Sequence, residues 1–183
     1  HGYLPLAMQA LKPSGGVIPA LVTDPEGTGA LLPWAPVMPL QAARLASRLA
    51  FDDTGARVAV VLRPCEARAA VELIKLKQIR PETLLFVTVD CPGTVETAAF
   101  AKSGLDPAAE SARLTGGMAS GAAQAGPVPF RTACTVCENA AALWGGIRVH
   151  AFGARTAEVL GVEAEPEIAQ KLEEAGLLTF DGG

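Results

Sequence analysis

The sequence predicts an α/β fold with a mainly parallel or mixed sheet, flanking helices and an irregular, Pro/Gly-rich N-terminal segment. Two almost continuous β-branched runs, 57–62 and 83–89, are typical of strands that are covered on both faces. A helix-like stretch, 64–78, separates them at the spacing of a strand–helix–strand unit, so we expect these strands to be parallel and joined by a right-handed crossover. A third apolar run, 147–152, adds another strand.

The composition indicates one substantial core. The chain has 183 residues, of which 50% are apolar and 19% charged, enough for a single main domain over 1–183. Within it we expect a loop and short-strand appendage at 1–39, a cysteine-bearing α/β core at 40–153 and a C-terminal helical segment at 154–183. The formal charge of −4 gives no electrostatic basis for nucleic-acid binding, and no apolar run is long enough for a membrane span.

The first half of the chain alternates loops with short elements. We expect strands at 17–23 and 30–32, with a turn at Pro25-Glu26-Gly27 between them. Residues 41–49 have the period of an amphipathic helix. In the helix predicted at 64–78, Pro64 suits the first turn because its missing N–H has no partner there anyway.

The second half contains a segment with almost no periodicity. Residues 111–129 are mostly Gly, Ala, Ser and Pro, so we expect a long exposed or cofactor-covering loop. Residues 166–175 predict a C-terminal helix that ends at Gly176.

Four cysteines carry most of the functional information. Cys65 and Cys91 each follow a predicted strand, 25 residues apart, and Cys134 and Cys137 form a C-x-x-C pair. Because parallel strands bring their carboxyl ends to one edge of a sheet, Cys65 and Cys91 should lie close together. Four thiolates can saturate one tetrahedral metal ion or one [4Fe–4S] cluster.

The cysteines also have simpler interpretations. A single cysteine at a strand end is usually a small buried apolar residue, and a C-x-x-C pair alone is compatible with zinc, a redox dithiol or a cluster. One close pair together with two isolated thiols favours a cluster over zinc. The N-terminus of the helix at 64–78 should lower the pKa of Cys65. A core of this size does not need disulfides, so we expect a reducing, cytoplasmic environment.

Other side chains near the cysteines are candidates for cofactor binding. Arg63 and Arg68 flank Cys65 and suit a flavin phosphate or an anionic substrate, or they are solvated charges at a helix end. Thr94, shortly after Cys91, is assigned to cofactor binding with them. Two tryptophans, Trp34 and Trp144, either stack on a flavin or pack in the core.

Three separated motifs resemble a known family. They are Arg-Pro-Cys-Glu-Ala-Arg-Ala-Ala-Val-Glu-Leu-Ile-Lys-Leu-Lys-Gln at 63–78, Asp-Cys-Pro-Gly-Thr at 90–94 and Ala-Cys-Thr-Val-Cys-Glu-Asn at 133–139. In this order they are similar to the coenzyme F420 hydrogenase/dehydrogenase beta-subunit family, and the likeness covers roughly 37–153. Only 46 residues follow Cys137, whereas family members commonly carry a longer C-terminal half.

The resemblance implies an iron–sulfur flavoprotein subunit. Its [4Fe–4S] cluster would be held by Cys65, Cys91, Cys134 and Cys137, and electrons would move between the cluster, FAD and a hydride carrier, F420 or similar, or a partner enzyme. The expected partners are catalytic or electron-donating subunits, or a second copy of the chain. Two alternatives stay open: a non-catalytic module with a four-cysteine structural zinc, and a cluster-only electron-transfer subunit without flavin.

Overall fold

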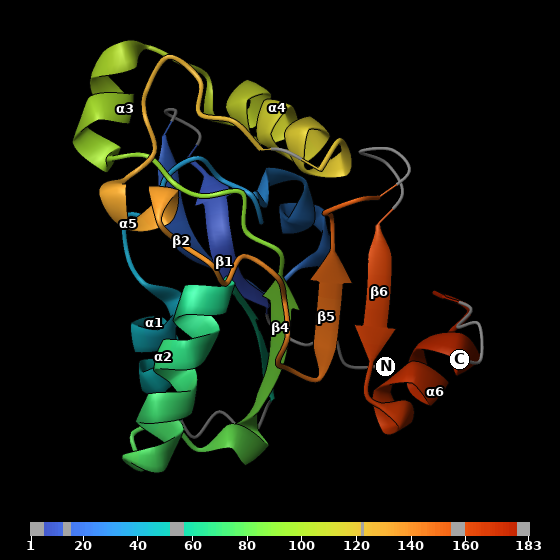
Figure 1. The fold of residues 1–183 in the computed structure, drawn as a ribbon. Helices are drawn as coiled ribbons and strands as arrows, with labels where there is room; N and C mark the ends of the chain where they lie inside the picture. The colour runs from blue at the N-terminus through green and yellow to red at the C-terminus, as the bar shows by residue number, and fades with distance from the viewer. Residues whose placement is uncertain (1–5, 13–15, 52–56, 122, 155–159, 179–183) are drawn as a thin grey trace.

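A computed structural model describes residues 6–12, 16–51, 57–121, 123–154 and 160–178, and it confirms the predicted α/β fold (Figure 1). One sheet holds six strands in the order β2-β1-β3-β4-β5-β6. The strands are β1 (Leu6–Leu11), β2 (Val17–Val22), β3 (Val58–Leu62), β4 (Leu84–Val89), β5 (Ile147–His150) and β6 (Gly161–Ala164). The α-helices are α1 (Ala42–Leu49), α2 (Pro64–Lys75), α3 (Thr97–Ser103), α4 (Pro107–Ala119), α5 (Thr132–Thr135) and α6 (Pro166–Glu174).

The centre of the sheet is parallel. Strands β1, β3, β4 and β5 pair in parallel, while β2 and β6 pair antiparallel at the two edges. The register of the β3–β4 pair runs from Val58 opposite Leu84 to Leu62 opposite Thr88. The parallel β3–α2–β4 unit predicted from the sequence is therefore confirmed, and the carboxyl ends of β3 and β4 lie at the same edge.

Helices α1 and α2 lie against the sheet on the side turned to the viewer in Figure 1 and bury the main core. Glu66 ties these two helices together. One carboxylate oxygen, Oε1, accepts the N–H of Ala42 at 2.6 Å, and Oε2 accepts the N–H of Arg63 at 3.0 Å. A single side chain thus satisfies one backbone donor at the start of each helix. The core itself contains these buried residues: Ala43, Ala46, Val58, Val60, Leu62, Ala70, Leu84 and Phe86.

Helices α3 and α4 lie beyond the arrowheads of β4 and β5 (Figure 1). The prediction of a loop throughout 111–129 was wrong, because α4 extends to Ala119. Its start has an ordinary signal: the Asp106 carboxylate accepts the N–H of Ala109 at 2.7 Å. Leu114 and Met118 are fully buried, and their burial outweighs the low helix propensity of the glycines within α4.

The first 39 residues, expected as a loop and short-strand appendage, contribute β1 and β2 to the sheet. The strand predicted at 17–23 is confirmed as β2, whereas β1 had no counterpart in the sequence prediction. The strand predicted at 30–32 was wrong. A 3-10 helix, η1 (Pro25–Ala30), occupies this region, and Leu31 makes an isolated β-bridge with Ala10.

The C-terminal helix is confirmed as α6, and Gly176 follows it with a φ of +66°. Its start is fixed to the sheet, because the N–H of Glu165 donates to the carbonyl of Gly146 at 2.9 Å. A second 3-10 helix, η2 (Pro81–Thr83), precedes β4. No helix in the described ranges has the length and apolar character that crossing a bilayer requires.

Candidate metal and cofactor site

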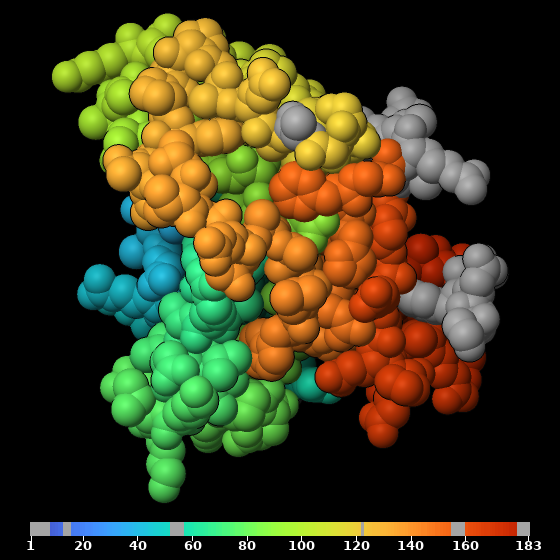
Figure 2. All heavy atoms as spheres, viewed as in Figure 1, coloured from blue at the N-terminus to red at the C-terminus, as the bar shows by residue number. Residues whose placement is uncertain are grey.

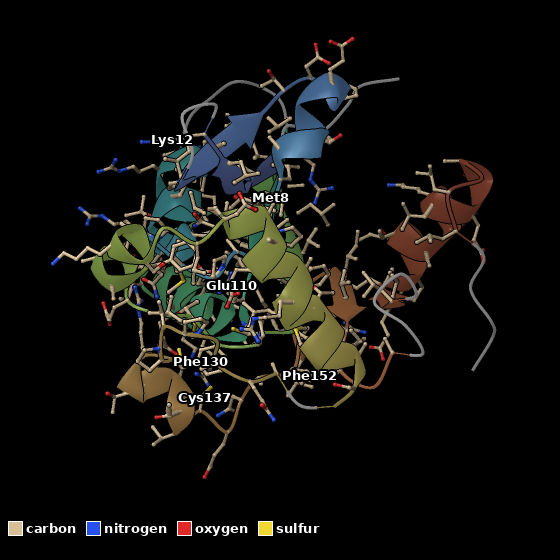
Figure 3. All side chains as sticks on the ribbon, turned by 90° about the horizontal axis from the view of Figure 1, so that it is seen from above. Met8, Lys12, Glu110, Phe130, Cys137 and Phe152 are labelled. Atoms are coloured by element: carbon tan, nitrogen blue, oxygen red, sulfur yellow. The ribbon has the colours of Figure 1, made fainter. Side chains whose placement is uncertain are left out.

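All four cysteines line one cavity of about 750 Å³ at the carboxyl edge of the sheet. All four are free thiols. Cys65 lies in the first turn of α2, Cys91 follows β4, and Cys134 and Cys137 lie in and just after α5. Figure 3 labels Phe130 and Cys137, on either side of α5, and Phe152, after β5; all three line this cavity and lie on one side of the molecule. The structure therefore gathers the thiols that the sequence predicted as one donor set.

Backbone hydrogen bonds position the thiols at the cavity wall. The N–H of Cys91 donates to the carbonyl of Ala140 at 2.8 Å, which joins the end of β4 to the chain that follows the C-x-x-C pair. The N–H of Cys134 donates to the carbonyl of Arg131 at 2.8 Å, and the N–H of Cys137 donates to that of Cys134 at 3.3 Å. These bonds make α5 a tight turn that presents both sulfurs.

Asp90, directly before Cys91, fastens the surrounding loops. It is 1% exposed, and its carboxylate accepts the N–H groups of Ala142 at 2.8 Å, Ala151 at 2.9 Å and Phe152 at 3.1 Å. Its backbone carbonyl accepts the indole N–H of Trp34 at 2.9 Å. One buried carboxylate therefore holds β4, the exit of β5 and the loop after Cys137 in fixed relative positions.

Three arginines line the same cavity: Arg63, Arg68 and Arg131. No carboxylate is found among the described residues of its lining. Arg63 is 3% exposed, Arg68 is exposed at the surface of α2, and Arg131 lies 3.3 Å from a carboxylate oxygen of Glu96. The three guanidinium groups give the lining positive charge, so a site that also holds four thiols is suited to negatively charged contents.

The thiol pKa values correct one prediction. We expected the start of α2 to lower the pKa of Cys65, but the pKa is raised from 9.0 to about 11. Burial contributes most, followed by Cys91 and Glu66, and together they outweigh the lowering by Arg63 and by the N–H of Glu66. Burial also raises the pKa of Cys91, although the charge of Arg63 opposes it. Both thiols are therefore protonated at neutral pH when no metal is bound.

The four thiols suit a cluster of several metal ions, both in their chemistry and in the space around them. The described residues hold no group of three or more His, Cys, Asp or Glu side chains arranged around a single ion position. In a four-cysteine zinc site the sulfurs would lie about 3.8 Å apart, because each Zn–S bond is about 2.3 Å long. A four-iron cluster spreads its thiolates more widely, since each one binds a different iron. The four thiols share a cavity large enough for such a group.

A second cavity, of about 420 Å³, adjoins the first. Pro64, Arg68 and Asn139 line both. Its walls are otherwise mainly apolar and come from α2 and from the loop before β5; they include Ala67, Val71, Leu143 and Trp144. In Figure 2, α2 in green and the orange loop lie side by side on the face turned to the viewer. This second, mainly apolar cavity therefore lies directly beside the cysteine cavity.

The structure brings every predicted site residue to the cysteine cavity: Arg63, Arg68, Thr94, Cys65, Cys91, Cys134 and Cys137 all line it. Their binding roles stay predictions. Trp34 does not line either of these two cavities, and Trp144 packs on Phe86 with ring centroids 4.8 Å apart while also lining the second cavity.

Sequence reasoning missed several residues of the cavity wall: Met38, Phe130, Arg131, Asn139 and Phe152. Arg131 had a usable signal, because it lies three residues before Cys134. Phe152 had none, because it reaches the cavity only through the β5 exit that Asp90 holds.

No known family model matches this chain. The resemblance at 37–153 therefore stays a prediction that rests on its three motifs.

Proposed function

We propose that this chain is an iron–sulfur flavoprotein redox subunit. It moves electrons between a [4Fe–4S] cluster, FAD and a hydride carrier, F420 or similar, or a partner enzyme. The observation that carries the proposal is a single cavity lined by four free thiols and three arginines, with no carboxylate among its described lining residues. Such a lining supplies both the ligands and the counter-charge that a thiolate cluster requires.

The residues of this chain prepare the site before any metal arrives. The raised pKa values of Cys65 and Cys91 mean that cluster binding must release protons from these thiols. Arg63 and Arg68 offset the negative charge that then develops. Asp90 keeps the loop after Cys137 against the end of β4, so the ligands that are far apart in sequence need little reorganisation.

The apolar cavity beside the cysteines supports the flavin part of the proposal. A flavin exchanges one or two electrons, so it links a one-electron centre to a two-electron hydride carrier. The mainly apolar walls, with Trp144 and Leu143, suit a flat ring system. Arg68 lines both cavities and suits an anionic phosphate at their boundary.

Partner subunits are part of the same proposal. Val136, between the two cysteines of the C-x-x-C pair, is 74% exposed, and Leu143 is 79% exposed. A catalytic or electron-donating subunit, or a second copy of the chain, that covers these side chains would come near the sulfur atoms. Four free thiols also favour a reducing, cytoplasmic environment for the working protein.

Anaerobic reconstitution with iron and sulfide, followed by a visible spectrum, tests this function. The proposal predicts a brown protein that is bleached by dithionite and that releases a yellow flavin on heating. A colourless protein with one tightly bound zinc would favour the structural-zinc alternative. A brown protein that binds no added FAD would leave only the cluster-based electron-transfer subunit.

A further inference from the structure

Arg63 is a buried cation in the wall of the cysteine cavity. It is the residue directly before α2, and only 3% of it is exposed. Its Nη2 donates to the carbonyl of Ala35 at 2.5 Å and, more weakly, to that of Pro33 at 3.4 Å. These carbonyls hold the guanidinium in place without neutralising it, since both are uncharged.

No ion pair involving Arg63 occurs in the part of the chain that the structure describes. The nearby Glu66 carboxylate is engaged by backbone N–H groups at the starts of α1 and α2. The Nη1 of Arg63 is buried and has no hydrogen-bond partner among the described residues. Glu66 and Arg63 also interact electrostatically, so the carboxylate offsets part of the Arg63 charge. A buried cation that is only partly offset favours further negative charge bound in the cavity.

A small cavity lined in part by Arg63 has room for about one water molecule. It holds about 10 Å³ and is lined by Gln9, Arg63 and Glu66, among others. Within the described ranges, the Oε1 of Gln9 is likewise buried without a partner. One donor and one acceptor around a space of about one water molecule suit a bridging water. A water supplies a hydrogen bond but no negative charge, so Glu66 offsets the guanidinium charge only from a distance, without an ion pair.

The thiols are the groups on which this charge acts. Arg63 lines the same cavity as all four thiols, and Cys65 lies two residues after it. The other two arginines of the cavity are less effective. Arg68 is exposed, so solvent and salt screen it, and Arg131 is close to Glu96.

We propose that Arg63 is the fixed counter-charge of the four-cysteine centre and raises its reduction potential. This inference rests on the proposed function and replaces the flavin-phosphate role expected for Arg63. A four-iron cluster with four thiolates carries two negative charges when oxidised. One electron from an external reductant makes the charge three, without breaking a bond. A buried cation stabilises the more negative state, so it favours reduction.

The test is a potentiometric titration of the reconstituted protein with dithionite, followed by electron paramagnetic resonance. Arg63→Met removes the charge while keeping an unbranched side chain. It should lower the equilibrium constant for one-electron reduction at least tenfold, which is a fall of about 59 mV in the reduction potential. Arg63→Lys keeps the charge and should stay within threefold of wild type. Arg48→Met, at an exposed position of α1 that does not line the cavity, should also stay within threefold.

A second variant covers the case in which Arg63→Met does not retain iron. Gln9→Glu adds a carboxylate to the lining of the small cavity that Arg63 also lines. It should lower the reduction potential as well, although Arg63 is still present. An unchanged potential in an iron-replete Arg63→Met protein would overturn the proposal. Where that variant loses its iron, an unchanged potential in Gln9→Glu would do the same.

Two further results distinguish this inference from the proposed function. If wild type binds the cluster but Arg63→Met loses FAD with no change in potential, Arg63 is a flavin ligand and only the present inference fails. If wild type binds no cluster under reconstitution, the proposed function fails and this inference falls with it.

Discussion

The hydroxyl oxygen of Thr94 lies 3.5 Å from the sulfur of Cys134, 40 residues further along the chain. This contact belongs to a junction between the turn after β4 and the segment that leads into α5. The N–H of Arg131 donates to the carbonyl of Thr94 at 2.8 Å, and Val95 forms an isolated antiparallel bridge with Phe130. The junction brings the C-x-x-C pair to the edge where Cys91 lies.

Thr94→Val should weaken the centre without unfolding the protein. Valine keeps the shape of threonine but removes the hydroxyl next to Cys134, which costs about 1 kcal/mol of stability at a buried site. We expect faster loss of iron to a chelator, measured as the decay of visible absorbance. Thr97→Val, in the first turn of α3, is the matched control and should decay at the wild-type rate. Equal rates for both variants would exclude a role for the Thr94 hydroxyl.

Asp90→Asn should destabilise the fold and the cavity together. The carboxylate accepts three backbone N–H groups, whereas an amide presents a donor to at least one of them. Leaving one buried N–H without an acceptor costs roughly 1–3 kcal/mol, measurable by urea unfolding. Asp106→Asn is the control, because asparagine caps the start of α4 as well as aspartate does. Equal unfolding midpoints for the two variants would contradict the role assigned to Asp90.

Gly93→Ala should disturb the site more than Gly104→Ala. Both glycines have positive φ, +102° and +70°, so alanine is strained at either position by roughly 1–2 kcal/mol. At Gly93 the added Cβ would also lie 3.3 Å from the ring of Phe130, while at Gly104 it would meet nothing within 4 Å. We therefore expect Gly93→Ala to lose more stability and more iron than Gly104→Ala. Equal losses would show that the Phe130 contact is unimportant.

The pH dependence of Cys65 alkylation follows from its raised pKa of about 11. In the metal-free protein, the rate with iodoacetamide should be low at pH 8 and rise about tenfold per pH unit towards pH 11, because only the thiolate reacts. The folded state keeps this proton to higher pH than the unfolded state, with its ordinary value of 9.0. The protonated Cys65 thiol therefore contributes its full share of folding stability below pH 9, and this contribution is lost as the pH rises towards 11. A plateau below pH 9 would contradict the raised pKa.

The β3–α2–β4 unit was predictable because each of its signals is local. Two apolar runs flank a helix that starts at Pro64, and the parallel register then brings Cys65 and Cys91 to one edge. A strand–helix–strand pattern also implies a tertiary contact, because parallel strands bring the residues at their carboxyl ends to the same edge of the sheet. The gathering of the cysteines was therefore the part of the site that the sequence could predict.

Other features depend on contacts that no local pattern carries. Strand β1 consists of Leu, Ala, Met and Gln, which favour helices, and it is a strand because it pairs between β2 and β3. Helix α4 contains glycines that obscure its period, although Asp106 and Pro107 mark its start. The burial of Arg63 depends on the carbonyls of Pro33 and Ala35, about 30 residues earlier, and was not predictable from its neighbours.

The iron and sulfide content of anaerobically reconstituted wild type, Cys65→Ser and Cys134→Ser tests the shared four-cysteine centre most directly. We predict about four irons and four sulfides per wild-type chain, as one [4Fe–4S] cluster requires. Each serine variant should lose most of both, because the two thiols, from α2 and α5, would serve the same centre. Full iron and sulfide retention in Cys65→Ser would contradict the account.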